Sequence, residues 1–333
     1  MNALPTLAPL LERFFTDRLM QQQRVSPNTV ASYRDTFRLL LAFARRQIKK
    51  DPCCLELEDI DATLITAFLD DLEINRAIGT RTRNLRLTAV HSFFRFVSYE
   101  EPAHSLLIQR VLAVPSKRQD QRMIQFLTRL EIEALLAAPN RTTWLGQRDH
   151  ALLLLAVQTG LRLSELTSLD RSSVFLGRGA HVRCIGKGRK ERCTPLTHQV
   201  ISTLRDWMAR PLKRQTDTLF PTIHGGCLSA DAVQYIVRKY VAIAREQCPS
   251  MKQKRVTPHV LRHTAAMELL QAGVDCTVIA LWLGHESVQT TQVYLHAHLA
   301  LKEAALEKIA PFEKMGSTRY RADDQLLQFL DAL

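Results

Sequence analysis

The stretch from Thr257 to His296 constrains this chain more than any other part of its sequence. It predicts two helices followed by a turn, because apolar residues recur at helical spacing and a glycine follows each apolar run. Gly273 comes after the first run and Gly284 after the second, where helices commonly end on glycine. The polar residues on these two helices and on the turn that follows are therefore the first place to look for a functional site.

Four polar residues of this stretch form a candidate site. His259 and Arg262 are three positions apart, so both side chains project from one face of the first helix. His285 lies on the turn after the second helix, and Tyr294 lies near the end of a short helix beyond it. Each residue alone is typical of a surface or a satisfied core. Together they form a cationic cluster without matching carboxylates, which favours an anionic ligand.

The charge of the whole chain points the same way. Its 333 residues carry 45 Lys and Arg against 33 Asp and Glu, which gives a net charge of +12 and a pI of about 9.6. This excess makes polyanions the first partner to consider, although a basic surface kept for solubility is the alternative. A hydrophobic content of 46% and this length predict a globular chain of two domains.

Neither a membrane segment nor a zinc site is expected. The early sequence has no charged segment before a long apolar core, and the apolar run 152–157 is too short to span a bilayer, so we expect a cytoplasmic protein without membrane contact. The seven cysteines, Cys53, Cys54, Cys184, Cys193, Cys227, Cys248 and Cys276, lack C-x-x-C pairs and are expected to be reduced thiols, with no metal bound.

Residues 1–114 are predicted to form a helical domain. Apolar residues from Leu7 to Leu19 follow helical spacing, and Ser26 before Pro27 predicts the start of a second helix. The segment from Arg76 to Tyr99 contains five arginines and no acidic residue, interleaved with apolar residues. This pattern predicts a helix with an apolar underside and a positive face that binds phosphates, against the alternative of a solvated basic face.

Residues 115–123 are polar, basic and non-periodic, which is typical of a linker. A positive linker between two positive domains suggests a clamp that closes around a duplex. The candidate DNA-binding residues of the domain, the linker and the hairpin described below are Arg76, Arg81, Arg83, Arg86, Lys117, Arg118, Arg189 and Lys190.

Residues 124–310 are predicted to form the second domain. Thr128 and Glu131 form a capping box, and an apolar helix from Arg148 to Gln158 ends at Thr159-Gly160. Arg162 then lies at the start of the next helix, beside backbone N–H groups that have no helical partner. Glu165, three residues on, could orient Arg162 from behind, although an exposed Arg–Glu pair of little consequence is the alternative.

A β-hairpin is predicted next, from strands at 181–185 and 191–196. Its tip, Gly186-Lys187-Gly188, leaves the lysine free to reach a ligand because glycines allow close approach on both sides. The alternative is a solvated basic turn. The pattern is not a P-loop, so nucleotide binding is not predicted.

In chain order these motifs resemble the tyrosine recombinase (phage integrase) family, in the small bacterial branch that includes Xer-like recombinases and mobile-element integrases. The resemblance rests on TGLRLSEL (159–166), IGKGRKER (185–192), TPHVLRHT (257–264), LGHES (283–287) and TTQVY (290–294). It implies a mainly α fold with a small antiparallel β element, in which a helical SAM-like core-binding domain precedes an α+β catalytic domain.

The resemblance also implies the reaction and the site. The catalytic residues would be Arg162, Lys187, His259, Arg262, His285 and the nucleophile Tyr294, acting without cofactor or metal through a 3′-phosphotyrosyl intermediate. Guanidiniums suit a phosphodiester because each can bind two of its oxygens. His259 is the nearest candidate base for the tyrosine, Lys187 the candidate donor to the leaving 5′-oxygen, and His285 a hydrogen-bond donor to the phosphate.

Partners are implied in the same way. The family resemblance predicts double-stranded DNA with inverted-repeat sites and a homotetramer on two duplexes, in the cytoplasm at the nucleoid. It also implies a tail at 311–333 that docks on a neighbouring subunit, against the alternatives of a tail that folds back on its own subunit or stays disordered. The favoured role is integration, excision or transposition of a mobile element. Xer-type dimer resolution, with or without a second recombinase, stays open, as do an inactive DNA-binding accessory protein and a type IB topoisomerase.

Overall fold

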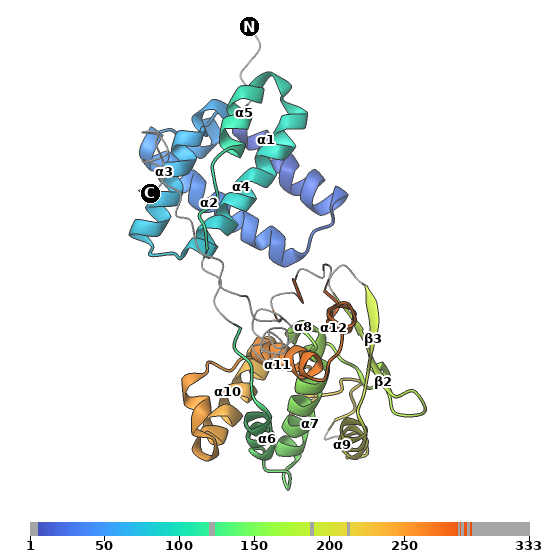
Figure 1. The fold of residues 1–333 in the computed structure, drawn as a ribbon. Coiled ribbons are helices and arrows are strands. Elements are labelled where there is room, and N and C mark those ends of the chain that lie inside the picture. Colours follow the sequence, from blue (N-terminus) through green and yellow to red (C-terminus); the bar gives the residue numbers. More distant parts are fainter. Residues whose placement is uncertain are drawn as a thin grey trace, which may run out of the picture. The chain divides into compact units, whose positions relative to one another are not determined.

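The computed structural model describes residues 6–119, 124–186, 190–211, 214–285, 287, 290, 291 and 294. The chain divides into two compact units, Met1–Gln121 and Arg122–Leu333 (Figure 1). The fold is mainly helical with one small antiparallel sheet, as the sequence predicts. Among the described residues no helix is both long and apolar enough to cross a membrane, and no group of His, Cys, Asp and Glu could hold a metal ion.

Unit 1 is helical. Its elements in chain order are α1 (Leu7–Arg13), the π-helix η1 (Phe14–Gln22), α2 (Pro27–Ile48), the 3-10 turns η2 (Pro52–Cys54) and η3 (Leu57–Asp59), α3 (Ala62–Asn75), α4 (Thr80–Glu100), the 3-10 turn η4 (Pro102–His104) and α5 (Ser105–Leu112). The expected helix from Arg76 begins only at Thr80, because Ala77 has a left-handed backbone with φ of 50° that turns the chain there. The separate helix α5 was not predicted.

The core of unit 1 is built around Phe14, which is fully buried. Its ring lies edge-on to Phe37 and Phe93, with centroids 6.1 and 5.4 Å away, and stacks on Tyr33 at 6.3 Å. Such aromatic pairs contribute roughly 0.5–1.5 kcal/mol each beyond the area they bury. The start of the π-helix is therefore fixed by packing between α2 and α4.

Local capping agrees with the sequence prediction. The Ser26 side chain accepts a hydrogen bond from the Thr29 amide at 3.2 Å, and Pro27 occupies the first turn of α2. The Ser26 hydroxyl thus satisfies an amide of the first turn, where amides have no helical partner, and Pro27 has no amide hydrogen to satisfy.

Unit 2 contains the sheet and the remaining described helices. Its elements in chain order are α6 (Arg129–Ala137), α7 (Trp144–Thr159), α8 (Leu163–Thr167), the 3-10 turn η5 (Arg171–Ser173), β1 (Val174–Phe175), β2 (His181–Ile185), β3 (Glu191–Pro195), α9 (His198–Met208), α10 (Ala230–Gln247), the 3-10 turn η7 (Pro249–Gln253), α11 (Pro258–Gln271) and α12 (Cys276–Leu283). The capping box of α6, Thr128 with Glu131, is present as predicted.

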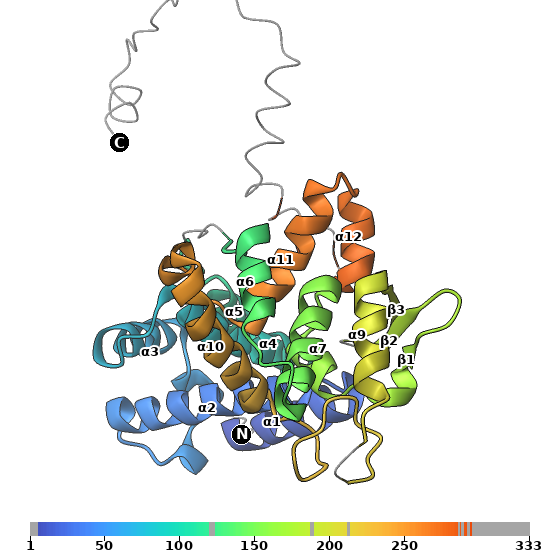
Figure 2. The ribbon, with the colours of Figure 1, turned by 90° about the horizontal axis from the view of Figure 1, so that it is seen from below.

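Helix α7 is the central element of unit 2, and it packs against α6, α9 and α11 (Figures 1 and 2). Its residues from Arg148 to Val157 are all buried. It ends at Gly160, whose φ is 63°, and a Cβ there would lie 2.7 Å from the Leu283 side chain. The glycine is required both by the backbone and by this close approach of the end of α12.

The described strands form one sheet in the order β1-β2-β3, all antiparallel. In the β2–β3 pair, Arg183 lies opposite Cys193 and Ile185 opposite Glu191. The predicted hairpin is therefore present, with α12 packed beside β3. Its tip, residues 187–189, lies outside the described residues, and β1 was not predicted.

Candidate active site

Arg162 is positioned by the break between α7 and α8. The chain leaves α7 at Gly160 and is extended at Arg162, which is the N-cap residue of α8. The Arg162 amide donates to Glu165 Oε2 at 2.7 Å and its Nη1 donates to Oε1 at 3.0 Å. The predicted contact exists, and it is no surface pair, because the Glu165 side chain is 2% exposed.

The end of α12 gathers three guanidiniums. Its last carbonyls have no partner within the helix and carry the negative end of the helix dipole. Three arginines from different elements donate to them: Arg192 to Trp282 at 3.2 Å, Arg262 to Leu283 at 2.7 Å and Arg162 to Gly284 at 2.6 Å. This arrangement fixes the turn that carries His285, and it brings β3, α8 and α11 together.

Arg192 is a residue that the sequence analysis missed. Its two Nη atoms donate to the two carboxylate oxygens of Glu165, both at 2.7 Å. A Cβ on Gly284 would lie 2.9 Å from Arg192 Nη1, and one on Gly186 would lie 3.1 Å from it, so both glycines make room for this guanidinium. Burial would raise the pKa of Glu165, but hydrogen bonds from Arg192 and Arg162 lower it below its ordinary value.

Arg262 is buried, with 4% of its surface exposed, and donates to the Gly160 and Leu283 carbonyls at 2.7 Å each. Burial, together with the nearby Arg162, lowers its pKa to about 10, so it remains a cation at neutral pH. A cavity of about 300 Å³ opens beside these arginines; it is lined by Leu161, Arg162, Leu163, Gln234, Thr257, Pro258, His259 and Arg262. A cation held by carbonyl dipoles beside such a cavity is suited to binding an anion.

Tyr294 lies deep in the same unit, with 2% of its surface exposed. Its hydroxyl oxygen is 2.9 Å from Nδ1 of His263, and its ring is parallel to that of His285 with the centroids 6.4 Å apart. Nδ1 of His285 in turn lies 2.8 Å from the Thr291 hydroxyl. Burial raises the pKa of Tyr294 to about 12, against the opposing effect of Arg262.

His263 was also missed by the sequence analysis. Its ring centroid is 4.2 Å from that of His259, one helical turn earlier on α11. Burial first, and then the neighbouring His259, Arg262 and His285, lower the pKa of His263 to about 4. The signal was present in the sequence, since a spacing of four residues places both histidines on one face of the helix.

The structure thus brings together five of the six candidate catalytic residues, Arg162, His259, Arg262, His285 and Tyr294. The sixth, Lys187, and the candidate DNA-binding residue Arg189 lie outside the described residues, as does the tail at 311–333.

The basic face of α4 is smaller than predicted. Arg76 and Arg81 are exposed, but Arg83 is 4% exposed and its Nε lies 3.6 Å from Glu73. Arg86 donates to the Ser32 carbonyl at 3.1 Å and the Thr36 hydroxyl at 2.9 Å, so it joins α4 to α2.

The prediction that Arg83 and Arg86 lie on an exposed positive face is therefore wrong, because tertiary packing uses both guanidiniums internally. Of the other candidates, Arg118 and Lys190 are exposed. Lys117 is also exposed and pairs with Glu73 at 2.5 Å.

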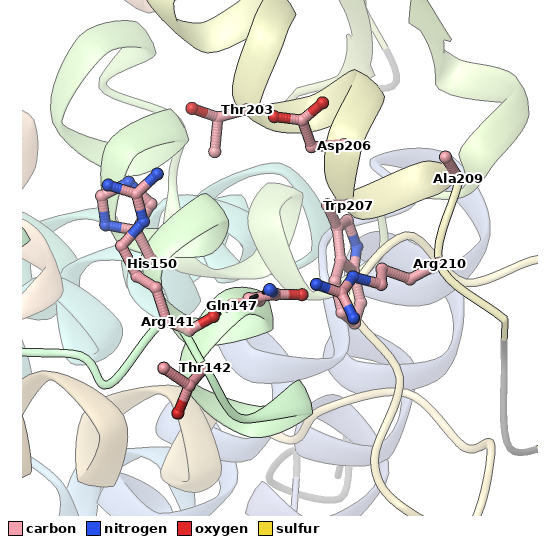
Figure 3. Close-up of a pocket in the computed structure, with 9 residues that line it drawn as sticks. All are labelled: Arg141, Thr142, Gln147, His150, Thr203, Asp206, Trp207, Ala209 and Arg210. Atoms are coloured by element: carbon pink, nitrogen blue, oxygen red, sulfur yellow. Dashed lines mark hydrogen bonds between the residues drawn. The ribbon is translucent and has the colours of Figure 1, made fainter.

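Another cavity of unit 2, of about 760 Å³, contains none of the candidate residues (Figure 3). It lies between the start of α7 and the end of α9, and is lined by Arg141, Thr142, Gln147, His150, Thr203, Asp206, Trp207, Ala209 and Arg210. Its volume alone does not make it an active site, since the anion-binding groups converge elsewhere.

Comparison with known proteins gives consistent matches over nearly the whole chain. The model of the phage integrase family matches residues 125–300, and that of the phage integrase N-terminal SAM-like domain matches residues 11–101. A Sinorhizobium fredii protein, y4rC, described as a candidate integrase/recombinase, is 60% identical over 98% of both chains. The tyrosine recombinase XerC of Pelotomaculum thermopropionicum is 33% identical over 84% of this chain and 90% of its own.

Among solved structures, the XerH site-specific recombinase bound to a palindromic difH substrate, in a post-cleavage complex, has a similar fold. The TM-score is 0.66 at 21% identity, and the match covers 89% of this chain and 93% of that one.

Proposed function

This chain belongs to the phage integrase family and is a tyrosine recombinase that cuts and rejoins DNA strands, and we propose that it is a site-specific recombinase of a mobile element. The observation that best supports this proposal is that Arg162 and Arg262 converge on the end of α12. Beside them lies Tyr294, whose hydroxyl contacts the neutral His263. The 60% identity with y4rC, which is described as an integrase/recombinase, supports integration, and we group excision and transposition with it. The 33% identity with the tyrosine recombinase XerC keeps dimer resolution as the second candidate.

In the proposed reaction, the scissile phosphate occupies the cavity beside Arg162 and Arg262. The two guanidiniums offset the negative charge that grows on the non-bridging oxygens in the pentacoordinate transition state. Tyr294 attacks phosphorus, and the bond from phosphorus to the 5′-oxygen breaks. The resulting 3′-phosphotyrosyl link conserves the energy of the phosphodiester bond for religation. Lys187 protonates the leaving oxygen and His285 donates a hydrogen bond to the phosphate.

The substrate is double-stranded DNA carrying inverted repeats, which agrees with the palindromic DNA in the XerH complex. Residues 1–114 and 124–310, joined by a linker at 115–123, bind it through exposed cations such as Arg76, Arg81 and Arg118, at the nucleoid in the cytoplasm. A homotetramer holds two duplexes, and the tail at 311–333 docks on a neighbouring subunit. Deleting residues 319–333 should then reduce recombination, and unchanged recombination would contradict the docking.

Covalent trapping on a nicked DNA site tests the proposed chemistry. The wild-type chain should form a protein–DNA adduct, while Tyr294→Phe should bind the same site and form none. Arg162→Ala should also lose cleavage, because the phosphate would lose one of its two guanidiniums. An adduct from Tyr294→Phe would refute the nucleophile, and no adduct from the wild type would favour an inactive accessory protein.

A second assay separates a recombinase from a type IB topoisomerase. A supercoiled plasmid carrying two recombination sites should yield deletion or inversion products if the chain is a recombinase. A type IB topoisomerase would instead relax the plasmid without joining the two sites.

A further inference from the structure

The hydroxyl group of Tyr294 is hydrogen-bonded to a histidine outside the set of six. Its oxygen lies 2.9 Å from Nδ1 of His263, and the phenol ring packs in an apolar cluster. The members of that cluster are Ala266, Met267, Leu270, Ile279 and Leu283. Since only 2% of Tyr294 is exposed, bulk water is excluded from the phenol. The proton that leaves Tyr294 during attack must therefore pass to a group of the protein or of the substrate.

His263 has the properties that a proton acceptor needs at this position. It is neutral at pH 7, because burial and the neighbouring His259, Arg262 and His285 lower its pKa to about 4. In the tautomer protonated on Nε2, Nδ1 presents a lone pair to the tyrosine hydroxyl. The distance of 2.9 Å is within the range for direct proton transfer.

The charge of the substrate makes His263 a stronger base when DNA is bound. The positive charges of Arg262 and Arg162 disfavour an imidazolium in the free site. A phosphodiester bound to these guanidiniums brings one negative charge, and its pentacoordinate transition state brings a second. Both offset the repulsion on a proton at His263, so proton transfer becomes favourable as phosphorus is attacked.

On the basis of the proposed recombinase function, we infer that His263, and not His259 as the sequence predicts, is the catalytic base that takes the proton of Tyr294 during cleavage and returns it during religation. In the forward step the proton moves from the hydroxyl to Nδ1 of His263 while the bond from the tyrosine oxygen to phosphorus forms. The bond from phosphorus to the 5′-oxygen breaks, and its electron pair leaves with that oxygen, which is protonated separately. His263 ends the step as an imidazolium that reprotonates Tyr294 when the 5′-hydroxyl attacks.

Two substitutions distinguish a base from a residue that only holds the hydroxyl in place. His263→Asn keeps a hydrogen-bond acceptor close to the position of Nδ1 but cannot take a proton, while His263→Ala removes both properties. Removing a general base lowers a rate by roughly 10²–10⁴-fold. Single-turnover cleavage of a nicked site should therefore fall about 100-fold or more in both variants. Their rates should rise with pH, because attack without a base requires Tyr294 to ionise beforehand. If His263→Asn cleaves within about threefold of the wild type, His263 is not the base.

A substrate with sulfur in place of the bridging 5′-oxygen assigns the defect to one side of the reaction, since a thiolate leaves without a proton. Lys187→Ala should recover on this substrate if Lys187 acts on the leaving group, whereas both His263 variants should stay slow. Recovery of the His263 variants would overturn the inference by placing His263 on the leaving group.

Controls separate this inference from the function it rests on. Each variant is first checked for wild-type affinity for its DNA site. If His263→Asn binds DNA more weakly, the test passes to His263→Ala, in which added imidazole should restore cleavage. Absence of rescue by imidazole would count against His263 as the base. If the wild-type chain forms no adduct, the proposed function fails. If the wild type forms the adduct and His263→Asn matches its rate, only the role of His263 fails.

Discussion

Replacing Arg192 with methionine should destabilise unit 2 and disorganise the active site together. Methionine keeps much of the aliphatic stem but loses the guanidinium, which is largely buried, with 12% of the side chain exposed. The variant loses two hydrogen bonds of 2.7 Å to Glu165 and one of 3.2 Å to the Trp282 carbonyl. Glu165 still pairs with Arg162, so its charge is not left without a partner.

The expected magnitude follows from these contacts. Breaking a buried ion pair by removing one partner costs about 3–5 kcal/mol, and hydrogen bonds to charged groups contribute about 1.5–3 kcal/mol each. Because Arg162 continues to neutralise Glu165, the lower end applies, and Arg192→Met should reduce the free energy of unfolding by about 3 kcal/mol. The loss should also slow adduct formation, since Arg192 no longer fixes the position of the Glu165 carboxylate that orients Arg162.

Urea unfolding followed by tryptophan fluorescence measures this change in the full chain. All three tryptophans, at 144, 207 and 282, belong to unit 2, so the signal reports that unit. Arg238→Met on the exposed side of α10 is the matched control and should change stability by less than about 0.5 kcal/mol. A loss below about 1 kcal/mol for Arg192→Met, with unchanged adduct formation, would refute the proposed role of this guanidinium.

The same variant has an expected pH dependence. The folded chain holds the pKa of Glu165 below its ordinary value of 4.5, so the pair stabilises the fold above that value, and the contribution is lost as pH falls through the folded pKa. Without Arg192 the lowering is smaller, so the variant should lose less stability on acidification, and its loss should be complete at a higher pH than that of the wild type. Identical acid limbs in the two unfolding profiles would contradict this assignment.

Three further changes test the packing and the DNA-binding surface. Gly284→Ala should reduce the free energy of unfolding by about 1–2 kcal/mol, because φ is 66° at this position. It should also slow cleavage, because the new Cβ would lie 2.9 Å from Arg192 Nη1. A variant that unfolds in urea and forms the adduct as the wild type does would contradict both expectations. In DNA-binding titrations at several salt concentrations, Arg81→Ala should reduce the slope of log affinity against log salt by about 0.9, whereas Arg83→Met should leave that slope unchanged. Because Arg83 is buried, Arg83→Met should instead destabilise unit 1 by about 2 kcal/mol, as measured by hydrogen exchange. Phe14→Ala should destabilise unit 1 by about 3–5 kcal/mol in the same exchange experiment, and a loss under 1 kcal/mol would show that its ring contacts matter little.

Signals that act over a few residues were sufficient to predict local structure. Ser26, the Thr128–Glu131 pair and Gly160 mark helix ends through contacts within one turn, and the structure contains all three. Such signals also predicted the helices of residues 1–114 and the hairpin, whereas the mainly α fold of the whole chain was implied by the family resemblance. The π-helix at Phe14 was not, because it depends on aromatic packing between residues far apart in the chain.

The arginines of α4 show why faces are harder to assign than helices. Two leucines of α4 that lie only two positions apart differ in burial, since Leu85 is 50% exposed and Leu87 is fully buried. The buried face also includes Arg83, whose carboxylate neighbour, Glu73, belongs to α3. A search for acids within α4 could not find that partner. Arg192 was missed similarly, because it was treated as part of a basic hairpin and its partner lies on α8.

The charges around the end of α12 suggest why this site favours the transition state over the bound substrate. Three guanidiniums, from Arg162, Arg192 and Arg262, converge there with one carboxylate, Glu165, while His263 and His285 have pKa values near 4 and are neutral. Three positive charges against one negative leave an excess of two among these described groups. A phosphodiester carries one negative charge and its pentacoordinate transition state carries two, while the proton of Tyr294 stays in the site on His263, so the total charge is unchanged but the attraction between the guanidiniums and the phosphoryl oxygens grows during attack. Interactions that strengthen as the transition state forms are those that accelerate a reaction.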